Sequence, residues 1–170
     1  GKPIAGGIPA AVYGFSQSVA DRIAAFLETR TPGHSGIGTT LAGSKIQLAL
    51  MRAVLETYFT QEAFAPLIAL AKKLEKGIAD VIIKHSLPWH VVRVGARVEF
   101  MCTPKPPRNG GEAAQMIHRP IDVALHHYLL NRGVIVTPFH NMMLICPATT
   151  GAHVNRLVEG LDACVTELMS

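Results

Sequence analysis

Apolar residues recur at the spacing of a helix in several parts of the chain. The spacing predicts helices at residues 16–28, 41–59, 60–85, 120–133 and about 152–168. The second of these is apolar on almost every side, which is typical of a buried helix, whereas the third carries a lysine-rich face opposite its apolar stripe. We therefore expect the second helix to lie inside a core and the third to lie at a surface.

Alternation of apolar and polar residues predicts the strands. Between residues 89 and 102, Val98 and Phe100 alternate with charged neighbours, which predicts one strand with one covered face. Residues 134–137 and 142–146 predict two further short strands on either side of a turn. Loops rich in glycine and proline are expected at residues 29–40 and 103–111.

From residue 60 onward the expected order of elements is helix, strand, helix, strand, strand, helix. This order predicts an α/β fold in which a short, mostly antiparallel sheet is covered by helices. The composition adds one point, because 49% of the residues are hydrophobic, 16% are charged and the mean hydropathy is +0.28. Such a chain is expected to cover part of its apolar surface with another part of its protein or with a partner subunit.

Several functions are disfavoured by composition. The formal net charge is +4, and the lysines and arginines are scattered, so we expect no nucleic-acid partner. No apolar run reaches the roughly 18 residues that a membrane-spanning helix needs, so we expect no membrane partner. The three cysteines show no metal-ligand spacing, which favours reduced thiols in a cytoplasmic protein, and the eight histidines give no reason to expect a metal site.

The first fourteen residues carry the candidate chemistry. Lys2 is the one charged residue in a run of small and apolar residues, and such a lysine is costly to desolvate unless it is paired, neutralised or covalently used. Gly6 and Gly7 allow the backbone to approach a neighbouring group closely. A lysine in this setting suits Schiff-base chemistry with an aldehyde. The alternative is a frayed cationic terminus ahead of a short buried strand at Ala10–Tyr13.

The run Gly-Lys-Pro-Ile-Ala-Gly-Gly-Ile-Pro-Ala-Ala-Val-Tyr-Gly resembles the lysine segment of class-III, fold-type-I aminotransferases that use pyridoxal 5′-phosphate (PLP). It is most similar to the branch of glutamate-1-semialdehyde aminomutase. The resemblance implies that Lys2 forms the Schiff base with PLP and moves the proton during catalysis. It also implies that the chain is the carboxyl-terminal part of a longer enzyme. Residues 1–59 would end the large PLP-binding domain and include a linking helix, and residues 60–170 would form the small carboxyl-terminal α/β domain.

A second glycine-rich stretch spans residues 38–45. It differs from a nucleotide-binding P-loop because Ser44 precedes Lys45 and a polar loop, rather than a strand, comes before it. It resembles instead the Gly-Thr-x-x-Gly turn of the same aminotransferase family. That resemblance implies that Thr40, with Thr39 beside it, binds the PLP phosphate of the neighbouring subunit in a homodimer whose active site lies at the interface. The alternative is that either threonine only caps a helix.

Substrate recognition is predicted from residues 137–143. Several related transaminases carry an arginine here that grips a substrate carboxylate, and this chain has none, so we expect Phe139 and His140 to contribute to the substrate pocket. An amine donor without an α-carboxylate then becomes plausible. The alternative is an arginine supplied from elsewhere, for which Arg93 and Arg97 are the candidates within this chain, although strand arginines more often face solvent.

The expected function is PLP-dependent transamination between a small-molecule amine or amino acid and a keto acid or aldehyde acceptor. Two alternatives stay open. An aminomutase would move the amino group within one molecule, and a non-catalytic fragment would only dimerise or regulate.

Overall fold

The computed structural model describes residues 1, 3–33, 37–38, 42–138 and 140–170. The chain divides into two compact units, Gly1–Gln61 and Glu62–Ser170, and each is described by itself. Assignment of the units to a large and a small domain stays a prediction. No helix among the described residues is both long and apolar enough to cross a membrane.

The described residues of the first unit form two helices, α1 at Gln17–Glu28 and α2 at Lys45–Thr57, close to two of the predicted ranges. Among its described residues only Ala5 and Met51 are buried. The prediction that the second helix is buried all round is therefore wrong for this unit, since residues on most sides of α2 are exposed.

The buried strand predicted at Ala10–Tyr13 is also wrong. These four residues form no strand, and Tyr13 is 70% exposed. The physical reason is that the described part of the first unit contains no other strand, and an isolated strand would leave its backbone donors and acceptors without partners.

The second unit is built on a three-stranded antiparallel sheet in the order β1-β2-β3. Its strands are β1 at His90–Val94, β2 at Arg97–Met101 and β3 at Asn141–Leu144. The single strand predicted over residues 89–102 is thus a hairpin. Its turn passes through Gly95, whose φ of 57° is left-handed and favours glycine.

The strand predicted at residues 134–137 is wrong, because this segment belongs to no ladder. The carbonyl of Val136 accepts a hydrogen bond from His126 Nδ1 at 2.7 Å. A side chain therefore occupies an acceptor that a neighbouring strand would otherwise have bonded. The loop predicted at residues 103–111 is shorter than expected. A short helix, α4 at Gly110–Gln115, begins inside it, and Asn109 caps this helix by accepting a bond from the Glu112 amide.

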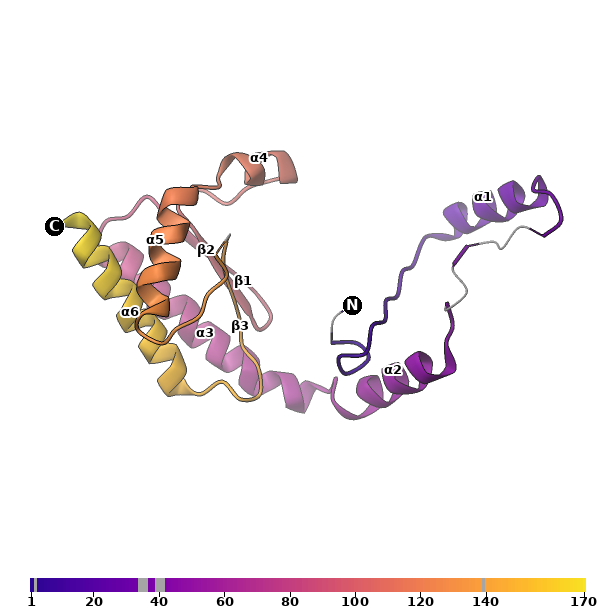
Figure 1. Ribbon diagram of the computed structural model, residues 1–170, viewed down its shortest axis with the longest axis horizontal. Coiled ribbons are helices and arrows are strands. Elements are labelled where there is room, and N and C mark those ends of the chain that lie inside the picture. Colours follow the sequence, from indigo (N-terminus) through magenta and orange to yellow (C-terminus); the bar gives the residue numbers. More distant parts are fainter. Residues whose placement is uncertain (2, 34–36, 39–41, 139) are drawn as a thin grey trace. The chain divides into compact units, whose positions relative to one another are not determined.

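Three long helices lie on one side of the sheet (Figure 1). They are α3 at Gln61–Lys84, α5 at Arg119–Leu130 and α6 at Gly151–Met169, and each lies close to a predicted range. Pro120 at the start of α5 and the capping box of Thr150 and His153 at the start of α6 fix where the two helices begin.

The core of the second unit lies between these helices and the sheet. Val98, Phe100 and Met143 supply the sheet side of it, and Leu74 and Leu161 are among the helix residues that pack there. The helical side chains face inward at the spacing that the sequence predicts, which is why the amphipathic pattern located these helices well. The predicted fold, a small α/β domain with a helix-covered antiparallel sheet, is confirmed.

Candidate functional site

Most of the predicted site residues lie outside the described part of the structure. Lys2, Thr39, Thr40 and Phe139 are among these, so their predicted roles stay predictions. His140 is described, as are the residues on both sides of Lys2 and the turn that follows them.

The segment that follows Lys2 folds as a series of tight turns. The amide of Gly6 donates to the Pro3 carbonyl at 3.1 Å, and the amide of Ile8 donates to the Ala5 carbonyl at 3.2 Å. Gly6 and Gly7 adopt φ values of 62° and 98°, which other residues rarely adopt. The two glycines therefore serve the backbone conformation. The close approach that the sequence predicted does not explain Gly7, because a Cβ added there would meet no atom within 4 Å.

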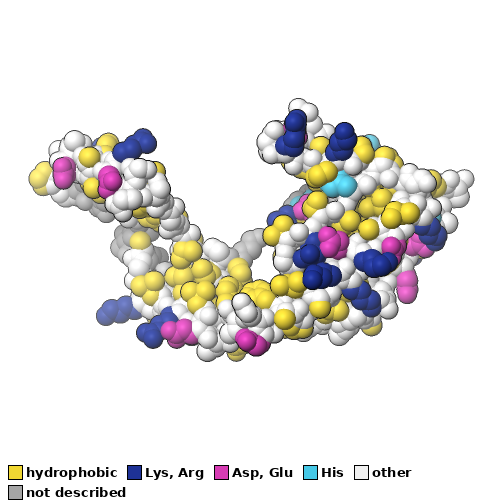
Figure 2. Space-filling model, turned by 180° about the vertical axis from the view of Figure 1, so that it is seen from behind, with side chains coloured by type: hydrophobic (Ala, Val, Ile, Leu, Met, Phe, Trp, Pro, Cys, Tyr) yellow, Lys and Arg dark blue, Asp and Glu magenta, His cyan; other side chains and the backbone are white. Residues whose placement is uncertain are grey.

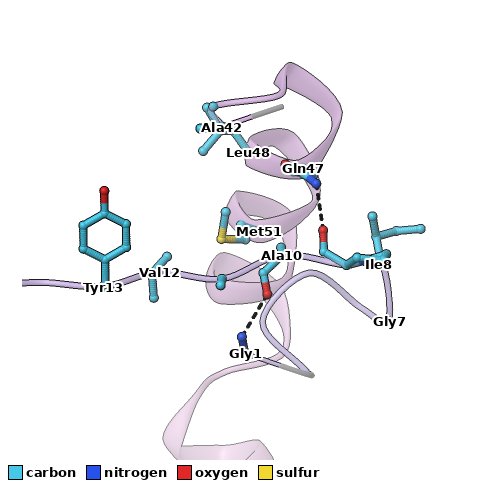
Figure 3. Close-up of a pocket in the computed structure, with 13 residues that line it drawn as sticks. Gly1, Gly7, Ile8, Ala10, Val12, Tyr13, Ala42, Gln47, Leu48 and Met51 are labelled. Carbon is cyan, nitrogen blue, oxygen red and sulfur yellow. Dashed lines mark hydrogen bonds between the residues drawn. The ribbon is translucent and has the colours of Figure 1, made fainter. Parts of the chain in front are cut away.

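These turns are fixed against α2. Ala5 is 1% exposed, and a Cβ added to Gly6 would lie 3.5 Å from a methyl group of Val54, so the turn rests on the helix at ordinary contact distance. Figure 3 shows Gln47 reaching from α2 to the turn, where its Nε2 donates to the Pro9 carbonyl at 2.8 Å. The nitrogen of Gly1 donates to the Ala10 carbonyl, also at 2.8 Å.

A cavity of about 870 Å³ lies between this opening segment and α2 (Figure 3). It is lined by residues 1 and 7–13 of the opening segment and by Ala42, Gly43, Gln47, Leu48 and Met51. No charged side chain is found among these lining residues, and Gln47 brings the amide group. The volume is in the range of small-molecule sites, and the mostly apolar lining suits a flat, uncharged part of a ligand.

His140 belongs to a polar cluster in the second unit. Its Nδ1 lies 3.3 Å from Glu99 Oε1, and its carbonyl accepts a hydrogen bond from the Thr137 hydroxyl. The other carboxylate oxygen of Glu99 pairs with Arg97 at 2.6 Å. His140 therefore lies beside a carboxylate, and the sequence did not indicate Glu99 as its neighbour.

The strand that follows His140 is anchored by a buried pair. Asn141 Nδ2 donates to Asp122 Oδ1 of α5 at 2.9 Å, and both residues are more than nine-tenths buried. Burial and, in second place, the charge of Asp122 raise the pKa of the Cys102 thiol to about 12. The sequence offered one indication of this cluster, a carboxylate within the apolar stripe of the helix at residues 120–133.

The two strand arginines are both engaged in ion pairs. Arg93 Nε lies 2.7 Å from Glu75 Oε2 of α3, and Arg97 pairs with Glu99. Arg93 is directed at a helix and not at solvent, so the general expectation for strand arginines fails for this residue. Each guanidinium is thus matched to a carboxylate within the same unit.

The cysteines differ in exposure. Cys164 is buried and Cys102 is partly buried, but Cys146 is exposed, and all three thiols are free. The hydrogen bond from Thr149 is the largest of the effects that lower the pKa of Cys146, whereas burial is the largest effect that raises the pKa of Cys164.

Comparison with known proteins gives clear relatives, although no protein-family model matches the chain. A glutamate-1-semialdehyde 2,1-aminomutase 1 from Bacillus cereus is 27% identical over 172 aligned positions, which cover 100% of this chain and 37% of the relative. Two other curated relatives with the same kind of name are covered to 30% and 36%, so the chain spans about a third of their length.

Solved structures extend this likeness. A glutamate-1-semialdehyde aminomutase from Pseudomonas aeruginosa PAO1 matches with a TM-score of 0.86 and 48% identity, over 99% of this chain and 38% of the other. A variant of that protein was solved in complex with PMP. A β-phenylalanine aminotransferase from Variovorax paradoxus shares the fold at a TM-score of 0.67 and 20% identity, over 87% of this chain and 34% of the other.

Proposed function

Because this chain belongs to the glutamate-1-semialdehyde aminomutase-like branch of the class-III aminotransferases and matches a carboxyl-terminal part of its relatives, we propose that it forms part of a PLP-dependent enzyme that moves an amino group. The observation that carries the proposal is the 48% identity to a solved aminomutase over 99% of the chain. The relative solved with PMP, the amino form of PLP, supports the cofactor.

The cavity beside the opening segment fits part of this cofactor. Its mostly apolar lining suits the pyridine ring, and Lys2 follows directly after Gly1, which is one of the lining residues. The described lining supplies no charged side chain for a phosphate or a ring nitrogen. We assign the phosphate contact to Thr40, supported by Thr39, from the neighbouring subunit of a homodimer, and the remaining charged contacts to parts of the enzyme outside this chain.

Lys2 would have two roles in the proposed reaction. Its Nζ would hold the cofactor covalently between turnovers and, once displaced by the substrate amine, would take a proton from the substrate Cα and return it during the reaction. The bound cofactor supplies an electron sink for the charge that develops at Cα.

Two reactions are compatible with this assignment. The names of the similar proteins support an aminomutase, in which amino donor and acceptor positions belong to one molecule. Transamination between separate molecules is supported by the loop at residues 137–143, which carries no arginine and presents His140 paired with Glu99. In that case Phe139 and His140 would face an amine donor without an α-carboxylate.

The three free thiols support a cytoplasmic location.

Spectroscopy and peptide mapping of the full-length protein that contains this chain test the proposal. We expect a visible absorption band that borohydride removes, with the PLP mass then fixed on the peptide that carries Lys2. Lys2→Arg should abolish the band and the label. The control Lys45→Arg, which changes another lysine of the same unit, should retain both. Absence of the band, or a label on another lysine, would contradict the proposal.

Substrate dependence separates the two reactions. An aminomutase should turn over a single substrate with PLP or PMP present, whereas a transaminase should stop after one half-reaction until an acceptor is added. The measurement is product formation over many turnovers with one substrate alone.

A further inference from the structure

We propose that Gln47 is a positioning residue that holds the turn following Lys2 in place, and this inference rests on the proposed function. Gln47 lies on α2, and its Nε2 donates to the Pro9 carbonyl across 38 residues of sequence. This hydrogen bond joins α2 to the extended segment that follows the glycine turn (Figure 3).

The need for such a tie follows from the turn itself. Gly6 and Gly7 have no side chains with which to anchor the backbone, and glycine gains more conformational freedom on opening than any other residue. The apolar anchor on this turn is small, because Ala5 contributes one buried methyl group. A hydrogen bond at Pro9, just after the glycines, closes the turn from its other end.

The chemistry of the contact suits this role. A proline carbonyl is a good acceptor, and its residue has no amide hydrogen and a fixed φ, so fixing the carbonyl also fixes the direction of the chain. Gln47 lines the same cavity as the turn and is itself only partly exposed, whereas Pro9 is exposed, so the bond fixes the turn from its solvent side. Movement of the turn would move the backbone that carries Lys2 relative to that cavity.

The experiment compares Gln47→Met and Gln47→Glu in the full-length protein. Methionine keeps the size and loses the donor, whereas a carboxylate keeps the shape and faces the carbonyl with a negative charge. Gln17→Met is the matched control, since Gln17 Nε2 also makes a 2.8 Å hydrogen bond, to Asp21 within α1. All variants are measured well below their unfolding temperatures.

Two quantities are measured. In the protein freed of PLP, amide exchange at residues 6–8 and 10 should rise about five-fold in Gln47→Met, which is the change expected for loss of one net hydrogen bond. The rate at which added PLP and borohydride label Lys2 should fall by a similar factor, more so in Gln47→Glu, and neither quantity should change in Gln17→Met.

The outcomes are distinct. If wild-type Lys2 takes no label, the proposed function fails, although the exchange data still report on Gln47. If wild-type Lys2 is labelled and both Gln47 variants exchange and label as the wild type does, the positioning role is overturned. A fall in labelling with no change in exchange at residues 6–10 also overturns it, because Gln47 would then act by some means other than holding the turn.

Discussion

The two units of this chain use their apolar residues in opposite ways. In the second unit, apolar side chains from α3, α5, α6 and the sheet form one buried cluster. In the first, only Ala5 and Met51 are buried among the described residues, and side chains as large as Tyr13 and Phe26 are more than half exposed. Figure 2 shows hydrophobic side chains at the surface of the first unit. An apolar pattern thus predicts which face of an element can be buried. Whether that face is buried depends on the presence of another element to pack against it.

The difference also separates structure from chemistry. The second unit contains the helices and sheet that its sequence pattern predicts, whereas the cavity and the glycine turn near Lys2 belong to the sparsely packed first unit. Regions with few buried contacts open easily, so we expect the first unit to depend on its surroundings for rigidity. This expectation can be tested with the chain itself.

Hydrogen exchange should show the largest contrast. Amides in the middle of α6, around Leu161, should exchange at least about a hundred-fold more slowly than amides in the middle of α2, since the former need the core to open and the latter only local fraying. The measurement is exchange on the isolated chain followed by peptide mass. Equal protection of α2 and α6 would contradict the contrast between the two units, because it would show that the first unit unfolds cooperatively despite its few buried side chains.

Removal of one aromatic side chain from each unit tests the same contrast in burial through the free energy of unfolding. Phe100 is 2% exposed in the core of the second unit, and Phe100→Ala should lower the free energy of unfolding by about 3–5 kcal/mol. Phe26 on α1 is 56% exposed, and Phe26→Ala should cost less than about 1 kcal/mol, most of it from its contact with Arg30. Urea unfolding followed by circular dichroism gives both values. Similar losses would show that Phe26 is buried in solution.

The sequence predicted the second unit well because its amphipathic elements pack against one another within the same unit. The helices at residues 60–85, 120–133 and 152–168 each bury an apolar stripe against the same sheet. The errors have local causes. Gly95 turns an apparently continuous strand into a hairpin, and a side chain takes the Val136 carbonyl that a strand at residues 134–137 would have used. Alternation alone carries no information about either event.

The candidate site was less accessible to the same reasoning. Family resemblance singled out Lys2, Thr39 and Thr40, but these three residues lie outside the described part of the structure. Gln47 could not be found from the sequence, because its contact joins residues that are 38 positions apart. The partner of His140 was missed for a similar reason, since Glu99 lies on a neighbouring strand.

Two glycines should differ in the reason for which they are needed. A Cβ on Gly77 of α3 would lie 2.7 Å from a methyl group of Val158 on α6, so Gly77→Ala should destabilise the second unit by about 1–2 kcal/mol despite the better helix propensity of alanine. Val158→Ala in the same chain should recover most of this loss. Gly6 has room but a φ of 62°, so Gly6→Ala should cost about 1–2 kcal/mol locally, and Val54→Ala should recover none of it.

Urea unfolding measures the first pair of variants, and amide exchange at the turn measures the second. Recovery of Gly6→Ala by Val54→Ala would mean that space, and not backbone conformation, limits the turn. The contrast between the two units would then be weaker than the burial of their side chains indicates.

The smallest effect concerns ion pairs. Lys84 and, to a lesser extent, His85 hold the pKa of Asp162 below its ordinary value and thereby join α3 to α6. A lowered carboxylate pKa stabilises the fold above the unfolded pKa of about 4, and this contribution is lost as the pH falls through the folded value. Lys84→Met should therefore reduce stability at pH 7 by less than about 1 kcal/mol, and the difference should shrink as the pH falls toward the lowered pKa of Asp162.

The matching pair in the first unit is Arg52 and Glu56, which are 2.8 Å apart within α2 and largely exposed. Arg52→Met should change the helix content of α2 slightly and leave the unfolding of the second unit unaltered, because a pair within one helix joins no two elements. Urea midpoints of both variants between pH 3 and 7, at low and high salt, check the two expectations. If Arg52→Met shifts the midpoint of the second unit as much as Lys84→Met does, the two units unfold together, and the contrast between a self-sufficient unit and a dependent one is wrong.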